Sequence, residues 1–175
     1  MKLNELKKNL NQASKENLIK QISDLFKKNA FVKDYYTIKY DEEQSLAVLA
    51  RYKDIIENEF LPDRGFGKAR LSVAKKAITD FKKLSGNKEQ IADIMLYYVE
   101  IGVAFTTTYG DIDGPFYTSM EGMYEQAVKY IVDAGLESLF IDRCLDVVND
   151  TKGMGWGFHD GLRITFDDYL SGKNV

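Results

Sequence analysis

The sequence predicts an all-α protein of about seven to nine helices, arranged as antiparallel pairs in a short HEAT-like α-solenoid or an irregular helical bundle. Three observations indicate this class. Apolar residues recur at the spacing of one helix face over most of the chain. Capping residues and glycines stand where these apolar stripes begin and end. Only 2 of the 175 residues are proline, and no segment shows the clear alternation that is typical of strands.

The N-terminal residues predict a helical hairpin. Leucines and isoleucines lie at helical spacing over 3–11 and over 14–29, and Ser14 is a suitable N-cap for the second helix. In leucine spacing alone the two segments resemble the SAP-type DNA-binding hairpin, although most such hairpins simply pack. We expect residues 1–175 to form a single helical domain, with 1–30 as an appendage that could fold apart.

The next segments predict helices joined by one loop. Residues 31–39 favour a short helix or turn, and their β-branched and aromatic content also permits a strand. Asp41 is a suitable cap for a long helix that reaches Phe60. A loop over 61–68 then leads to a helix over 69–85.

The second half predicts four more helices. The first, over 87–107, is capped by Asn87 and is apolar on nearly all sides, which is typical of a central helix. The others are expected over 119–134, 136–149 and 160–170. Short connections between them predict antiparallel neighbours.

Two polar, glycine-punctuated stretches, 109–121 and 153–161, interrupt this helical pattern. They contain the only Trp and the only His of the chain. Helices do not require such residues, so a binding or catalytic site is expected here if the protein has one. The candidate residues are Tyr109, Asp111, Asp113, Glu121, Trp156, His159 and Asp160.

The carboxylates and the imidazole of these stretches permit two interpretations. If the stretches meet, their oxygens and His159 could surround a divalent cation, as in a metal-dependent hydrolase, although the spacing matches no known metal motif. The alternative is structural. Asp111 and Asp113 would accept hydrogen bonds from loop amides, and Asp160 would lie in the first turn of the last helix. Beyond this divalent metal, no cofactor is indicated.

The aromatic residues of the same stretches also permit two interpretations. We expect Trp156, together with Phe158, Phe116 and Tyr117, to anchor its loop on the core. The alternative is that the indole forms the floor of a ligand pocket.

Charge is distributed unevenly along the chain. Residues 1–88 contain 19 Lys and Arg against 12 Asp and Glu, whereas residues 89–175 contain 5 against 15. A basic cluster precedes and begins the helix over 69–85, and it consists of Arg64, Lys68, Arg70, Lys75 and Lys76. A solvated helix face explains it most simply. Contact with phosphate, nucleic acid or a protein is the alternative, and the acidic pI of about 5.3 argues against nucleic acid.

Composition also restricts whether the protein can be disulfide-bonded, secreted or membrane-bound. Cys144 is the only cysteine, which excludes an intramolecular disulfide, and its apolar surroundings indicate a core residue. The charged N-terminus is unlike a signal peptide. The most apolar window, 91–105, contains Asp93 and Glu100 and is too short to span a bilayer. We therefore expect a cytoplasmic protein without a membrane partner.

The two polar stretches also carry a resemblance. Tyr109–Glu121, with the pattern YGDIDxPFYxSME, and Gly155–Asp160, GWGFHD, resemble a family of uncharacterised bacterial proteins, classed as a domain of unknown function. The likeness extends over most of the chain. It implies an all-helical, HEAT-like or bundle-like domain and transfers no catalytic role to any residue.

The function that these patterns favour is a non-enzymatic helical module that binds a protein or peptide. A metal-dependent enzyme using Asp111, Asp113, Glu121, His159 and Asp160 is the first alternative. Weak nucleic-acid binding through the basic N-terminal half is the second. Whether the protein is an enzyme is left open by the sequence.

Overall fold

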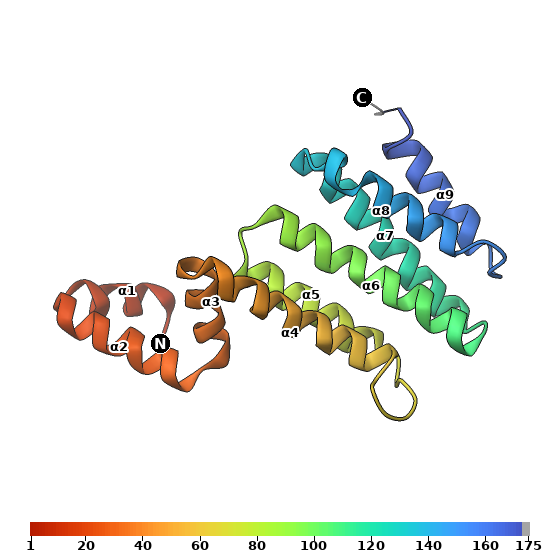
Figure 1. Cartoon of the computed structure of the whole chain (residues 1–175). Coiled ribbons are helices and arrows are strands. Elements are labelled where there is room, and N and C mark those ends of the chain that lie inside the picture. Colours follow the sequence, from red (N-terminus) through yellow and green to blue (C-terminus); the bar gives the residue numbers. More distant parts are fainter. Residues whose placement is uncertain (173–175) are drawn as a thin grey trace. The chain divides into compact units, whose positions relative to one another are not determined.

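The computed structural model describes residues 1–172, and this part of the chain consists of nine α-helices without a strand (Figure 1). The all-α prediction is therefore confirmed. The helices are α1 (Leu3–Asn11), α2 (Lys15–Lys28), α3 (Ala30–Tyr40), α4 (Glu42–Phe60), α5 (Leu71–Leu84), α6 (Lys88–Tyr109), α7 (Gly114–Ala134), α8 (Glu137–Asp150) and α9 (Phe158–Tyr169).

The chain divides into two compact units, Met1–Val48 and the part from Leu49 onward, with the boundary inside α4. In the first unit α2 packs on α3. The Asn29 side chain accepts a hydrogen bond from the backbone N–H of Val32 at 3.2 Å, which starts α3 directly after α2. The segment that permitted a strand is therefore helical. No residue of α1 or α2 is buried.

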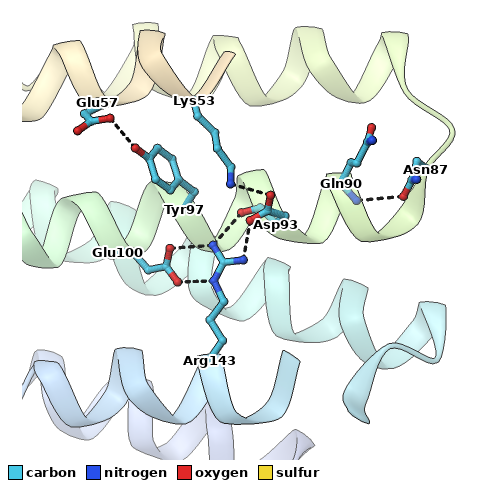
Figure 2. Close-up of polar contacts among 8 residues, drawn as sticks. All are labelled: Lys53, Glu57, Asn87, Gln90, Asp93, Tyr97, Glu100 and Arg143. Carbon is cyan, nitrogen blue, oxygen red and sulfur yellow. Dashed lines mark hydrogen bonds and ion pairs between the residues drawn. The ribbon is translucent and has the colours of Figure 1, made fainter. Parts of the chain in front are cut away.

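The second unit is built around α6, which packs against α5, α7 and α8. Asn87 caps α6 by accepting the N–H of Gln90 at 3.1 Å, as its sequence predicts (Figure 2). Twelve residues of α6 are buried, including Ile94, Leu96 and Tyr98. This helix is therefore apolar on nearly all sides because it is buried on several sides.

Three helix starts differ from the sequence prediction, and one of them is α5, which begins at Leu71 instead of residue 69. α7 begins at Gly114, not Ser119, because the Asp113 side chain accepts the N–H of Phe116 at 2.9 Å and Pro115 fits the first turn of a helix. α9 begins at Phe158, two residues before the expected start. Most of the first polar stretch therefore belongs to a helix.

An ionic network connects α4, α6 and α8 (Figure 2). The Arg143 guanidinium donates to Glu100 at 2.5 and 2.8 Å and to Asp93 at 2.5 Å. Lys53 Nζ lies 2.6 Å from the second oxygen of Asp93, and the Tyr97 hydroxyl donates to Glu57 at 2.6 Å. These directional contacts set the register of α4, α6 and α8 beyond what apolar packing specifies.

Among the described residues, α6 alone has the length and apolar composition that could cross a membrane, and 61% of the relevant window is buried within the structure. The core helix of a soluble protein meets the same two criteria. The interior position of α6 accounts for its apolar composition.

Candidate functional site

Three connections come together at one end of the second unit: α4–α5, α6–α7 and α8–α9 (Figure 1). Because consecutive helices run in opposite directions, every second connection returns to this end. The exposed residues Phe66, Tyr109, Asp111 and Trp156 lie on these connections or at their edge. We call these four residues the loop-end surface.

A continuous series of ring contacts supports the loop-end surface. Neighbouring ring centroids are 5.0–6.4 Å apart along the series Phe66, Tyr109, Phe105, Phe116, Tyr117 and Trp156. The middle three rings are buried, whereas Phe66, Tyr109 and Trp156 are 83%, 40% and 64% exposed. Tyr109 and Trp156 therefore rest directly on buried rings, which limits their motion, and Phe66 lies against Tyr109.

The two polar stretches of the sequence meet at this end. The Tyr117 hydroxyl donates to the Asp111 carboxylate at 2.9 Å and shares a hydrogen bond of 2.8 Å with Thr106. A Cβ placed on Gly155 would lie 2.9 Å from Asp111 Oδ2, so this loop approaches Asp111 closely. Asp111 is thus held between the start of α7 and the α8–α9 connection.

Trp156 adopts an unusual backbone conformation. Its φ of 64° lies in the left-handed region, which is strained for a bulky residue. The indole stacks on Tyr117, with centroids 6.4 Å apart and an interplanar angle of 28°. The indole lies on the buried Tyr117, as expected for a ring that anchors its loop on the core, yet it remains 64% exposed. Phe158 is the more deeply anchored ring of this loop, because it is fully buried with its centroid 5.0 Å from that of Tyr117.

Most of the candidate metal-ligand side chains have structural roles within the fold. Asp113 caps α7, and Asp160 lies in the first turn of α9. His159 Nδ1 lies 3.0 Å from the Val148 carbonyl oxygen and 3.1 Å from the Thr151 hydroxyl, which ties the imidazole to the end of α8. Within residues 1–172, no group of three or more His, Cys, Asp and Glu side chains is placed to hold a metal ion.

Glu121 and Cys144 are affected by burial. Burial raises the pKa of the Glu121 carboxyl, whose oxygen would lie 3.1 Å from a Cβ added at Gly161. Burial also raises the pKa of the Cys144 thiol to about 12. A thiol with such a pKa is not a nucleophile at neutral pH, which agrees with a core role for Cys144.

The basic cluster is partly neutralised by carboxylates. Arg70 donates to both oxygens of Glu59, at 2.8 and 2.5 Å, and its hydrogen bonds hold the pKa of the buried Glu59 below its usual range. Lys76 pairs with Asp80 one turn along α5. Arg64 and Lys68 are exposed, and Lys75 lines a shallow hollow with Gly114 and Pro115. Two of the five cations, Arg70 and Lys76, therefore have a carboxylate partner within the fold.

The sequence interpretation missed Phe66, the most exposed aromatic residue of the loop-end surface. Its signal was present: glycines stand on both sides of it in a loop. A Cβ on Gly67 would overlap the Phe60 carbonyl, so the loop crosses the end of α4 at a distance that only glycine allows. This close crossing places Phe66 against Tyr109.

Comparison with known proteins gives one match. No curated protein and no solved structure matches the chain. The model of a family of unknown function, DUF6155, matches residues 1–169 and so includes both polar stretches and all of the described helices. The chain therefore belongs to the DUF6155 family, a family of unknown function.

Proposed function

We propose that the protein is a non-enzymatic interaction module that binds a segment of a partner protein at the loop-end surface. The observation that carries the proposal is Trp156. A large ring that is 64% exposed is held in a strained backbone conformation and is stacked on a buried tyrosine. Strained residues cluster where a fold serves binding, and Trp is the residue most enriched among interface anchors.

The rigidity of this surface supports binding. Tyr109 rests on buried Phe105 at 5.0 Å between centroids, and Trp156 rests on Tyr117. Because these rings are already ordered, a partner would immobilise few additional rotamers on binding. Three exposed rings on one end of a helical unit also exceed the scattered single apolar residues of an ordinary surface.

At the Trp156 end of this surface, the Asp111 carboxylate favours a partner segment with a basic side chain. Asp111 is close to the Trp156 loop, because a Cβ added to Gly155 would lie 2.9 Å from its Oδ2, and it accepts a hydrogen bond from Tyr117, on which the indole stacks. An Arg or Lys placed over the indole would gain a cation–π contact and a carboxylate partner. A cationic residue within an apolar segment fits this arrangement better than an acidic one.

The metal-dependent alternative has less geometric support. It needs the side chains of Asp111, Asp113 and His159 to converge. Asp111 and Asp113 instead accept hydrogen bonds from Tyr117 and Phe116 of α7, and His159 Nδ1 lies 3.0 Å from the Val148 carbonyl oxygen of α8. These bonds explain why the three residues stand at these positions without a catalytic role.

The test is selection of binders from a phage-displayed library of random linear peptides. We expect the wild-type chain to enrich sequences with Arg or Lys next to an apolar residue. The Trp156→Gly variant should lose at least about tenfold in affinity for them. Leu139→Ala is the matched control, since Leu139 is 61% exposed on α8 and should leave binding unchanged.

Folding of the test variant is checked separately. Glycine accepts a φ of 64°, so relief of strain offsets the lost stacking in Trp156→Gly, and its circular dichroism spectrum should match wild type. Selected peptides that bind a folded Trp156→Gly variant as well as wild type would refute the proposal. So would a selection that enriches no peptide.

A further inference from the structure

A groove lies between α6 and α8 in the second unit, close to the C-terminal ends of both helices. Its volume is about 370 Å³, which falls within the roughly 300–1,000 Å³ of typical ligand sites. Residues of these two helices line it: Glu100, Val103, Ala104, Thr107, Thr108, Val147 and Asp150. The loop-end surface shares none of them, so this groove is a separate candidate site.

The register of the two helices explains the shape of the groove. α6 and α8 run in the same direction, since both end where the loop-end surface lies (Figure 1). The Arg143 guanidinium donates to the Glu100 carboxylate, and this pair marks one end of the groove (Figure 2). Asp150 follows Arg143 by seven residues and Thr107 follows Glu100 by seven, so both lie about 10 Å further along. Alanine and valine side chains form the floor between the two ends.

The polar side chains of the groove offer hydrogen-bond acceptors to a ligand. The Thr107 hydroxyl donates to the Val103 carbonyl oxygen at 2.9 Å, and the Thr108 hydroxyl donates to the Ala104 carbonyl oxygen at 2.8 Å. A hydroxyl whose hydrogen is used in this way has only lone pairs left for a ligand. The other two polar side chains are carboxylates, which only accept when they are ionised. A ligand that donates hydrogen bonds is therefore favoured over a phosphate or a carboxylate.

The charges around the groove favour a cation, also when the neighbouring connections are counted. Lys53 and Arg143 pair with two carboxylates of α6, so this network is neutral. From the network to the start of the next helix, α4, α6 and α8 with their connections (54–70, 101–113 and 144–157) contain eight Asp and Glu against four Lys and Arg. The two helices that line the groove also present their C-terminal ends to it, and each such end carries the equivalent of about half a negative charge.

We propose that the α6–α8 groove binds an aliphatic ammonium or guanidinium group. Its methylene stem lies on Val103, Ala104 and Val147, and its cationic head donates to the Asp150 carboxylate and to the two threonine hydroxyl oxygens. A lysine or arginine side chain of a partner protein and a free alkylamine share this chemistry. The proposal does not rest on the proposed function, because it involves no residue of the loop-end surface.

The probe is n-butylammonium, and its binding to the full chain is followed by chemical-shift changes in the ¹⁵N-labelled protein. We expect saturable shifts at the amides of residues 103–108 and 147–151. n-Butanol has the same stem without the charge and should bind at least about fivefold more weakly. Pentanoate has the same stem with a carboxylate and should cause no shifts in the groove.

Two variants test the residues of the groove. Asp150→Asn keeps the shape of the side chain and should weaken n-butylammonium binding at least about threefold. Ala104→Leu fills the floor and should abolish binding. Asp142→Asn is the matched control, because Asp142 is an exposed carboxylate of α8 that does not line the groove. Trp156→Gly should also leave binding unchanged, which keeps this test separate from the loop-end surface.

Several outcomes would overturn the proposal. If n-butanol or pentanoate binds as tightly as n-butylammonium, or if n-butylammonium causes no shifts in the groove, the groove does not select a cation. An equal effect of Asp150→Asn and Asp142→Asn would indicate general attraction to an acidic surface. Nα-acetyl-lysine amide distinguishes the two sources of the ligand: binding at least as tight as that of n-butylammonium assigns a protein side chain, and weaker binding assigns a free amine.

Discussion

Alanine substitution of two glycines in helix interiors tests how α6 packs on α7, which is the packing that supports the loop-end surface. A Cβ on Gly102 of α6 would overlap Met120 Sδ and lie 2.8 Å from its Cε, and Met120 is fully buried. A Cβ on Gly122 of α7 meets nothing within 4 Å. The same Gly→Ala change therefore overpacks the core at Gly102 and causes no overlap at Gly122.

The magnitudes follow from two terms. Each substitution gains about 0.5–1 kcal/mol because alanine is the better residue inside a helix. Overpacking at Gly102 costs about 1–3 kcal/mol. Since the helix term is shared, Gly122→Ala should be more stable than Gly102→Ala by about 1–3 kcal/mol. In a Met120→Ala background the overlap disappears, so Gly102→Ala should then be stabilising.

The assay is urea unfolding, with free energies taken from linear extrapolation. Trp156 is the only tryptophan, so its fluorescence reports on the second unit, and circular dichroism follows all helices. Equal stabilisation by Gly102→Ala and Gly122→Ala, unchanged in the Met120→Ala background, would show that α6 and α7 do not pack as described.

The remaining predictions concern charged groups of the second unit. Arg143→Met leaves two carboxylates, 22% and 29% exposed, without their shared cation, and should destabilise the unit by about 1–3 kcal/mol in urea unfolding, between the values for exposed and buried pairs. Arg143→Lys should recover part of this loss. The pKa of Glu59 is lowered in the fold, so its contribution is present above about pH 4.3 and is lost as pH falls through the folded pKa. The difference in stability between wild type and Glu59→Gln should shrink in that direction, and a constant difference would contradict the pairing with Arg70. Burial raises the pKa of Glu121, so the contribution of this carboxyl to stability changes with pH in the opposite direction and becomes unfavourable as pH rises. Glu121→Gln should gain stability relative to wild type as pH rises above the ordinary glutamate range.

Most of the helices could be predicted because the residues that begin and end a helix act within one turn of it. Ser14, Asp41 and Asn87, the caps expected from the sequence, each accept an amide of their own first turn, which depends only on nearby sequence. The start of α7 is harder to predict because Gly114 and Pro115 are equally typical of a loop. Pro115 is compatible with a first helical turn, and the choice depends on the Asp113 cap.

The candidate site could be predicted only in part. The residues of the two polar stretches were identified from composition, and the contacts of Asp111 and Trp156 with the opposite stretch depend on helices far apart in the chain. The burial of Phe158 and the exposure of Trp156 could not be assigned from sequence. Both rings suit a core, and only the packing against Tyr117 decides which one enters it.

The sequence by itself determined the helices, the central position of α6 and the concentration of unusual residues at two connections. These follow from apolar spacing and caps, which act within a few residues. The tertiary structure decided which side chains meet. The pairing of Arg143 with Asp93 spans 50 positions, and the stacking of Trp156 on Tyr117 requires α7 and the α8–α9 connection to meet at one end. Such contacts depend on the crossing of helices, which no local pattern specifies.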